Sequence, residues 1–382
     1  MTIRGKTAIV GIHEYESRFD PLASAMSMEA TSTRRALEDA GLAKSDVDAV
    51  FSHRGMDLCE YMDINPKVLD TTNAGGGSYQ FHVAHAAAMI AAGQCEVALI
   101  TYSEKGRSGR STGMRSGGSQ LIAPGPDQFE TTYGVGGAPT TYSLVASRHM
   151  AEYGTTSEQL AEIAVQTRQH ASTNPFAVMR EPITIADVLK SRMIADPLHL
   201  LDCCLVTDGG GAFIMTSAER ARDLKKKPVY VLGVGTAVAH GSLGNRDLTT
   251  VAAAQSAPRA FAEAGVTHDD IDLAMVYDSF TITVLCTLED LGFCPKGEGG
   301  HFVEGNTLSL TGKLPTNTDG GGLSSNHPGQ RGIFLIFEAV RQLRGERTGN
   351  QIPDCKIALC HGTGGSIATR HSGGTVILST EG

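Results

Sequence analysis

The sequence contains no tryptophan, and aromatic residues make up only 5% of its 382 positions. Proteins that bind single-stranded nucleic acid stack bases on aromatic side chains, so this composition argues against such a surface. The 41 acidic residues outnumber the 32 basic ones and give a formal net charge of −9. We therefore expect no broad attraction to nucleic acid or to an anionic membrane, although a local basic pocket can still bind an anion.

Long apolar runs and paired cysteine motifs are also missing. No stretch reaches the roughly 18 uninterrupted apolar residues that a membrane-spanning helix needs. The first ten residues lack the hydrophobic segment of a signal peptide. The eight cysteines contain no CxxC pair, and we interpret them as reduced thiols without a structural metal site. These features predict a cytoplasmic protein that holds no metal.

Glycine is abundant, and one glycine-rich loop is the most informative stretch of the chain. Residues 315–329 contain three successive glycines, a turn-prone Asn-Thr-Asp and His327. Such glycines let the backbone approach a ligand or another strand closely. A histidine held there can move protons near neutral pH. On these residues alone, an ordinary glycine-rich turn with a surface histidine remains the alternative.

The chain contains a repeat of itself. Residues 35–48 resemble residues 259–272, and each copy predicts the end of an amphipathic helix, a glycine cap and a turn into a strand. Two similar halves indicate a duplicated α/β core with pseudo-twofold packing. We place the N-terminal half at residues 1–225 and the C-terminal half at residues 226–382.

Further elements repeat in the same order in both halves. The first half continues with a helix over 78–92, for which Ser78 is a plausible N-cap, and a buried strand over 97–100. The second half has a helix over 332–343 and a strand over 356–360. This agreement strengthens the prediction of a duplication.

A long insertion over residues 105–200 interrupts the first half. It opens with a flexible basic stretch, 105–115, and then predicts helices over 143–153 and 157–171. The basic stretch is either a solvated loop or part of a cap whose arginines contact a ligand phosphate.

Four motifs, in order, give the chain a family resemblance. They are a glycine turn at Asn73–Ser78, an acidic residue two before phenylalanine in Tyr277–Phe280, the stretch from Asn317 to Pro328, and a glycine-rich turn at Cys360–Gly365. With these motifs the chain resembles the thiolase superfamily, and within it the sterol-carrier-protein-type and lipid-transfer-type thiolase-like proteins. The resemblance implies a duplicated, five-layer αβαβα fold with two pseudo-twofold-related halves and an inserted loop or cap domain.

One departure from the family pattern bears directly on the chemistry. Thiolases carry a nucleophilic cysteine in the first motif, where this chain has Gly76, and no residue from Asp70 to Ser78 is a cysteine. Without a thiolate, the two-step transfer through an acyl-enzyme lacks its covalent carrier. Ser78 could attack in principle but is better placed as a helix cap.

The resemblance still implies an oxyanion site and a proton-transfer pair. The residues expected to bind the thioester and its oxyanion are Gly76, Gly77, Ser78, Asn317 and Gly362. His327 matches the family histidine, Cys360 matches the acid/base cysteine, and His361 beside it is a substitute.

The second motif adds Asp278 and Tyr277 to the catalytic candidates. Ordinary thiolases have asparagine or histidine where this chain has Tyr277. The bacterial steroid side-chain aldolases, a related branch without the cysteine, have tyrosine there and cleave β-hydroxyacyl-CoA by a retro-aldol reaction. They carry a tyrosine near the position of His327, so the match to that branch is partial.

These residues favour an enzyme that breaks or forms a carbon–carbon bond in an acyl-CoA. His327 or Tyr277 would be the base, and Cys360 or His361 would return a proton to the α-carbon. Direct acyl transfer to free CoA is a second version. In both versions CoA is a substrate or carrier, and no cofactor is expected.

Two alternatives belong to other classes of protein. The chain could be a non-catalytic acyl-CoA or lipid-binding protein that serves lipid transfer. It could also be a subunit that acts only with a small OB-fold protein carrying a zinc ribbon. The resemblance alone implies a homodimer.

Overall fold

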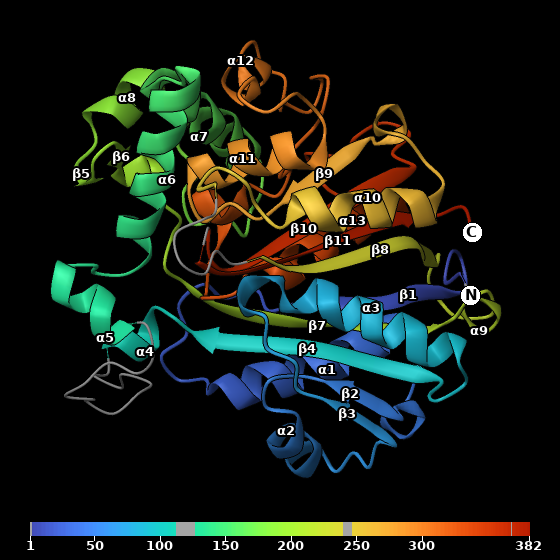
Figure 1. The fold of residues 1–382 in the computed structure, drawn as a ribbon. Coiled ribbons are helices and arrows are strands. Elements are labelled where there is room, and N and C mark those ends of the chain that lie inside the picture. The colour runs from blue at the N-terminus through green and yellow to red at the C-terminus, as the bar shows by residue number, and fades with distance from the viewer. Residues whose placement is uncertain (1, 112–126, 240–246, 368) are drawn as a thin grey trace.

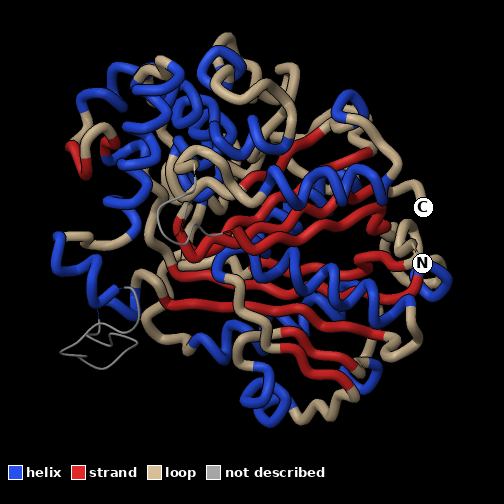
Figure 2. Tube along the Cα trace, viewed as in Figure 1, coloured by secondary structure: helices blue, strands red, loops and turns tan. Residues whose placement is uncertain are grey.

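The computed structural model describes residues 2–111, 127–239, 247–367 and 369–382 (Figure 1). One large sheet runs through the molecule (Figure 2). Its N-terminal strands are β1 (Thr7–Glu14), β2 (Ala49–Phe51), β3 (Val68–Asp70), β4 (Val97–Lys105) and β7 (Asp208–Ser217). Its C-terminal strands are β8 (Val229–Ala239), β9 (Leu273–Val276), β10 (Ile357–Ser366) and β11 (Thr369–Ser379).

The described strands form a nine-stranded sheet in the order β3-β2-β4-β7-β1-β8-β11-β10-β9. In the first half, β2 is parallel to β4, and β4 and β1 are antiparallel to β7. The second half repeats this pattern, because β9 is parallel to β10, and β10 and β8 are antiparallel to β11. The predicted duplication is therefore confirmed, and the halves join where β1 pairs with β8.

Four long helices pack against this sheet, as the five-layer fold implied by the family resemblance requires. The outer helices α1 (Ala25–Ala40) and α10 (Ala253–Ala264) each cover one half of the sheet. The helices α3 (Ser78–Ala91) and α13 (Gly332–Arg344) lie between the halves, and their side chains share one apolar cluster with strands of both. The two central helices begin close together, because an ideal Cβ at Gly332 would lie 2.2 Å from the carbonyl oxygen of Gly76.

The repeated glycine caps also form as predicted. Gly41 and Gly265 end α1 and α10 with φ of +75° and +63°, a left-handed conformation that favours glycine. A short 3₁₀ turn follows each cap, at Lys44–Asp46 and His268–Asp270, before the chain enters β2 or β9.

The insertion forms a helical layer over the end of the C-terminal half (Figure 1). Its predicted helices correspond to α6 (Ala138–Tyr153) and α7 (Ser157–Ser172). The rest of its described part comprises α4 (Ser108–Ser111), α5 (Asp127–Glu130), α8 (Ile185–Lys190), β5 (Met193–Ala195) and β6 (Leu198–His199). Residues 112–115 of the basic stretch lie outside the described residues.

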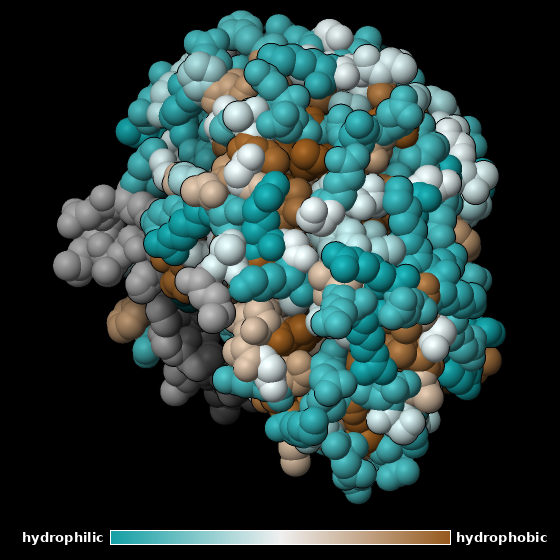
Figure 3. Space-filling model, turned by 90° about the vertical axis from the view of Figure 1, so that its right-hand side faces the viewer, coloured by the Kyte–Doolittle hydropathy of each residue, from teal (hydrophilic) through white to brown (hydrophobic). Residues whose placement is uncertain are grey.

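The remaining elements are peripheral or support the site. They are α2 (Gly55–Met62), α9 (Ala218–Ala221), α11 (Thr281–Leu291), α12 (Gly299–Val303) and several single turns. Hydrophilic residues cover most of the face that carries the chain termini, and hydrophobic residues form separate patches on it (Figure 3). In the part of the chain that the structure describes, no helix is apolar over enough length to cross a bilayer.

Candidate active site

A cavity of about 730 Å³ lies where the start of α3, the ends of β9 and β10, and the His327 loop meet. Its glycine-rich floor consists of Gly75, Gly76, Thr363, Gly364 and Gly365. Its other walls include Tyr277, Ser279, Phe280, His327, Pro328, Gly329, Gln330 and the segment 203–206. The structure therefore brings the predicted residues Gly76, Tyr277 and His327 into one cavity.

Tyr277 and His327 form a hydrogen-bonded pair in this cavity. Tyr277 Oη lies 2.9 Å from His327 Nε2, and the two rings are almost perpendicular. Tyr277 is only 5% exposed, and burial raises the pKa of its phenol far above the usual value. The backbone N–H of Arg331 also donates to Tyr277 Oη at 3.3 Å. The arrangement joins a neutral phenol to an imidazole, so a proton can pass between them.

A buried ion-pair network holds the loop that carries His327. The fully buried guanidinium of Arg331 contacts Asp278 Oδ1 at 3.0 Å, both carboxylate oxygens of Asp319 at 2.7 Å, and Asn326 Oδ1 at 2.8 Å. Two charge-assisted contacts to one carboxylate fix the orientation of the guanidinium. Arg331 thus fixes both the loop, through its side chain, and Tyr277, through its backbone.

Asp278, which the sequence predicts to be catalytic, belongs to the ion-pair network of Arg331. Its carboxylate accepts the backbone N–H groups of Gly322 at 2.8 Å and Leu323 at 3.2 Å, in addition to its contact with Arg331. Burial raises the pKa of the Asp278 carboxyl to about 6, although Arg331 and the two amides oppose this rise. Asp278 is not among the residues that line the cavity, and its contacts are those of a residue that holds the glycine loop in position.

Close packing explains why the loop needs glycine. Gly321 has φ of +63°, and a Cβ on it would lie 2.0 Å from Asp278 Oδ2. Asn317 begins this loop, and its Oδ1 accepts the backbone N–H of Val276 at 2.9 Å. Asn317 is buried and does not line the cavity. In the structure, Asn317, which the sequence predicts to bind substrate, fixes the end of β9.

Gly76 leaves no room for a side chain. A Cβ at this position would lie 2.3 Å from Tyr277 Cε2 and 2.5 Å from the carbonyl oxygen of Thr363. Contacts below 3.0 Å do not occur for real Cβ atoms without movement of a neighbour. The ring of Tyr277 therefore occupies the space that a side chain at position 76 would need.

The other predicted oxyanion residues lie just outside the cavity lining. Gly77 packs against Gly362, with 2.9 Å between its ideal Cβ and Gly362 O. Ser78 is the first residue of α3, so the prediction that it is the N-cap is wrong by one residue. Its buried hydroxyl donates to Gly75 O at 2.6 Å and accepts from Ala74 N at 2.9 Å. Ser78 stabilises the glycine turn and cannot reach a substrate.

Cys360 and His361 are not in the cavity. Cys360 faces the core against α13, where its Sγ lies 3.5 Å from Leu335 O and burial raises its pKa. His361 faces the opposite side of the sheet, with Nδ1 2.9 Å from Thr375 Oγ1, and burial lowers its pKa to about 3. Strand β10 continues to Ser366, so its end at the cavity is Thr363–Gly365. The two predicted proton donors therefore lie on β10 before the part of the strand that lines the cavity.

Sequence reasoning missed the segment 203–206, which forms one wall of the cavity, and Thr207, which follows it. Cys204 N donates to Ser279 O at 2.9 Å, Leu205 N to Gly322 O at 2.9 Å, and Thr207 N to His327 O at 3.3 Å. The segment therefore connects the end of β9, the glycine loop and His327. The adjacent cysteines were the available signal, but only the tertiary structure shows where they lie.

The remaining walls of the cavity are largely apolar. The ring of Tyr142 stacks on that of Phe280, with 4.5 Å between centroids. The other apolar side chains are Pro139, Ile194, Leu200, Leu205 and Val206. None of the described residues that line the cavity is an aspartate, glutamate, lysine or arginine. An apolar group next to the reacting atoms therefore fits this cavity.

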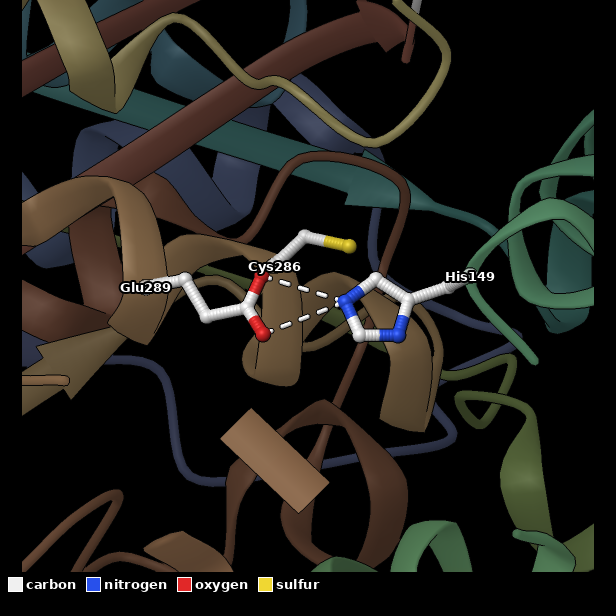
Figure 4. A group of neighbouring side chains, drawn as sticks. All are labelled: His149, Cys286 and Glu289. Carbon is white, nitrogen blue, oxygen red and sulfur yellow. Dashed lines mark hydrogen bonds and ion pairs between the residues drawn. The ribbon is translucent and has the colours of Figure 1, made fainter. Parts of the chain in front are cut away.

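The described residues contain one group of side chains close enough together to hold a metal ion, namely His149, Cys286 and Glu289 (Figure 4). His149 Nε2 lies 3.1 Å from both carboxylate oxygens of Glu289. That carboxylate also contacts Lys296 Nζ at 3.1 Å and accepts two backbone N–H groups. Because Lys296 already supplies positive charge, we interpret the group as a buried anchor between α6 and α11.

Comparison with known proteins places this geometry in a family. The Thiolase C-terminal domain-like family model matches residues 235–380. The acetyl-CoA acetyltransferase of Methanothermobacter thermautotrophicus is 34% identical over 351 residues, which cover 87% of this chain and 90% of the relative. The steroid side-chain-cleaving aldolase of Thermomonospora curvata is 34% identical over 377 residues, covering 94% and 96%.

The solved structures agree with this relationship. The "Ltp2-ChsH2(DUF35) aldolase" matches with a TM-score of 0.87 and 32% identity, and the match covers 99% of both chains. Human mitochondrial 3-ketoacyl-CoA thiolase, at 15% identity and a TM-score of 0.72, shares the fold. The chain belongs to the thiolase superfamily, in its sterol-carrier-protein-2-like branch close to the steroid side-chain aldolases, and is a thiolase-like lyase or acyltransferase acting on CoA thioesters.

Proposed function

We propose that this enzyme cleaves a β-hydroxyacyl-CoA by a retro-aldol reaction, without a cysteine acyl-enzyme. The observation that carries the proposal is the overlap between Tyr277 and any side chain at Gly76. Gly76, which we align with the thiolase nucleophile, has no side chain, and the phenol of Tyr277, hydrogen-bonded to His327, occupies the adjacent space. This arrangement supports proton transfer from a substrate hydroxyl rather than attack on a thioester.

The reaction begins when the Tyr277–His327 pair removes the proton of the β-hydroxyl group. The electron pair of the O–H bond forms the carbonyl, and the bond between the α- and β-carbons breaks. Its electrons move into the thioester as an enolate, whose oxygen lies near the start of α3. The backbone N–H of Gly76 is our candidate oxyanion donor, together with the turn at Thr363–Gly365.

The test is incubation of the purified protein with a β-hydroxyacyl-CoA that carries a bulky apolar β-substituent. We expect a ketone or aldehyde and a shortened acyl-CoA in equal amounts. One suitable substrate is the 17-hydroxy-3-oxo-4-pregnene-20-carboxyl-CoA named for a relative that is 35% identical. Cleavage of a β-ketoacyl-CoA that depends on added CoA would instead support direct acyl transfer, as the likeness to acetyl-CoA acetyltransferases suggests.

One variant distinguishes an enzyme from a protein that only binds acyl-CoA or lipid. If the protein is an enzyme, His327→Ala removes turnover, because half of the proton relay is lost. In a binding protein the same change leaves most of the affinity for acyl-CoA intact and has no activity to remove.

We also propose that the protein acts as a homodimer and associates with a small OB-fold protein carrying a zinc ribbon. The second proposal is supported by the similar structure whose name pairs an aldolase with a DUF35 protein. Light scattering of the purified protein, alone and mixed with such a subunit, measures both associations. Activity without the second subunit would show that the subunit is not required.

A further inference from the structure

The retro-aldol reaction leaves an enolate whose α-carbon must receive a proton. The proposed base, Tyr277 with His327, has just accepted the proton of the substrate hydroxyl. The two donors expected from the sequence, Cys360 and His361, are both buried away from the cavity. The site therefore needs a separate acid among the residues that line it.

Most of the lining groups with an exchangeable proton are already engaged in hydrogen bonds. Tyr142 Oη lies 3.4 Å from Gly365 O. Ser279 Oγ pairs with Thr283 Oγ1 at 3.0 Å. Cys203 Sγ donates to His199 O at 3.3 Å. The remaining thiol in the lining belongs to Cys204.

The backbone holds Cys204 beside the proton relay. Its N–H donates to Ser279 O, two residues after Tyr277, and the preceding Cys203 forms a β-bridge with Phe280. The next residue, Leu205, is bonded to Gly322 of the His327 loop. With bonds on both sides, the Cys204 backbone cannot move without disturbing β9 or the loop.

We propose that the thiol of Cys204 is the acid that protonates the α-carbon of the enolate. The S–H proton moves to carbon, the enolate electrons form the new C–H bond, and the thioester carbonyl is restored. The resulting thiolate recovers a proton from water, and the relay releases the hydroxyl proton to water, so the protons balance. This assignment rests on the proposed retro-aldol function.

The chemistry of a thiol suits this step. A thiol is intrinsically a better proton donor than a serine hydroxyl. Burial raises the pKa of Cys204 and so weakens it as an acid, but it also keeps the proton on sulfur at neutral pH. The enolate carbon of a thioester is a stronger base than a thiolate and can therefore still accept this proton. The same shift makes Cys204 a poor nucleophile toward a thioester at that pH.

The reverse step provides the experiment. In D₂O, without a carbonyl substrate, the protein should exchange the α-protons of propionyl-CoA for deuterium, as followed by mass spectrometry. Cys204→Ala should slow this exchange by about 100-fold or more, the lower end of the range for loss of a general acid. Cys204→Ser, which keeps the shape, should also slow it. The control is Cys59→Ala on α2, a cysteine that is not among the residues lining the cavity, and it should leave the exchange rate close to that of the parent protein.

Ketone release from a β-hydroxyacyl-CoA is measured in the same variants, so that the role of Cys204 and the retro-aldol function are tested separately. Exchange that persists in Cys204→Ala, or that falls equally in Cys59→Ala, overturns the role of Cys204. Ketone release by a protein that shows no exchange also overturns it but leaves the retro-aldol function standing. Absence of both reactions, measured with and without the proposed OB-fold subunit, would refute the proposed function itself. Thermal unfolding of each variant shows whether it is folded.

Discussion

The two central helices occupy equivalent places in the duplicated core but begin in opposite ways. Helix α3 follows Gly75–Gly77, a turn with no side chains that packs directly on the end of β10. Helix α13 follows Arg331, a fully buried charge with three side-chain partners. One copy thus lets the ring of Tyr277 pack directly on the backbone at the cavity, and the other provides rigid support for His327. A duplicated fold can divide the parts of one site between its halves.

The largest expected effect comes from the half that carries the proton relay. Tyr277→Phe keeps the ring that fills the space at Gly76 but removes the hydroxyl bonded to His327. We expect the rate of carbon–carbon cleavage to fall by roughly 100- to 10,000-fold, the range for loss of general acid–base catalysis. Steady-state kinetics on a β-hydroxyacyl-CoA gives the rate.

Tyr142→Phe is the matched control for this prediction. It removes a second cavity hydroxyl, whose partner is the carbonyl of Gly365. Its rate should stay close to that of the parent protein. An equal loss in both variants would mean that the cavity is sensitive to any lost hydroxyl, and it would contradict the special role of the pair.

Arg331 tests whether the buried charge supports the second helix start. Arg331→Met leaves Asp278 and Asp319 without their cation, and breaking such a buried pair costs about 3–5 kcal/mol. Chemical denaturation measures the free energy of unfolding. Arg148→Met, in an exposed pair with Glu152, should cost no more than about 1 kcal/mol. A similar cost for both would show that the buried network does not stabilise the fold.

A double-mutant cycle tests the glycine turn at the start of α3. Gly76→Cys forces a side chain against Tyr277, and such overpacking typically costs about 1–3 kcal/mol. Tyr277→Asn removes the ring, so the double variant should be more stable than the sum of the two changes predicts. We expect a favourable coupling of roughly 0.5–3 kcal/mol between the two positions. Additive effects would contradict the overlap of the two side chains.

The smallest expected effect is on the pH dependence of stability, through Glu14, whose carboxylate accepts from Asn326 Nδ2 in the His327 loop. Burial alone would raise the pKa of Glu14, but Arg18 and Arg341 lower it to about 2. The stability from this carboxylate is therefore full above about pH 4.5, its ordinary value, and is lost as the pH falls toward 2. Glu14→Gln should flatten the acid limb of a plot of unfolding free energy against pH. An unchanged slope would contradict the assignment.

The sequence was sufficient to predict the halves of the fold because the repeat is local. Each copy places a helix, a glycine cap and a strand in the same order, and Gly41 and Gly265 adopt the predicted conformation. The loop with His327 was also predictable, since a glycine run next to a histidine is visible in the chain. The sequence offered His327 and Tyr277 as alternative bases, and only the structure shows that the two are hydrogen-bonded to each other.

The misplaced residues depend on features that no local pattern contains. The length of β10 decides whether Cys360 or Thr363 reaches the cavity, and the strand continues to Ser366. Asp278 precedes a phenylalanine, as the motif requires, yet its partner Arg331 lies 53 residues away. The wall at Cys204 arises from hydrogen bonds to distant segments. Register and long-range contacts therefore account for the errors.

The overlap between residue 76 and Tyr277 also constrains how such an enzyme can change by single substitutions. A lineage that gains a side chain at position 76 while keeping the tyrosine passes through a crowded protein. A lineage that loses the tyrosine first passes through a protein without the hydroxyl that is hydrogen-bonded to His327. Each order of steps changes this pair or crowds it, so single substitutions that place a side chain at position 76 should be rare.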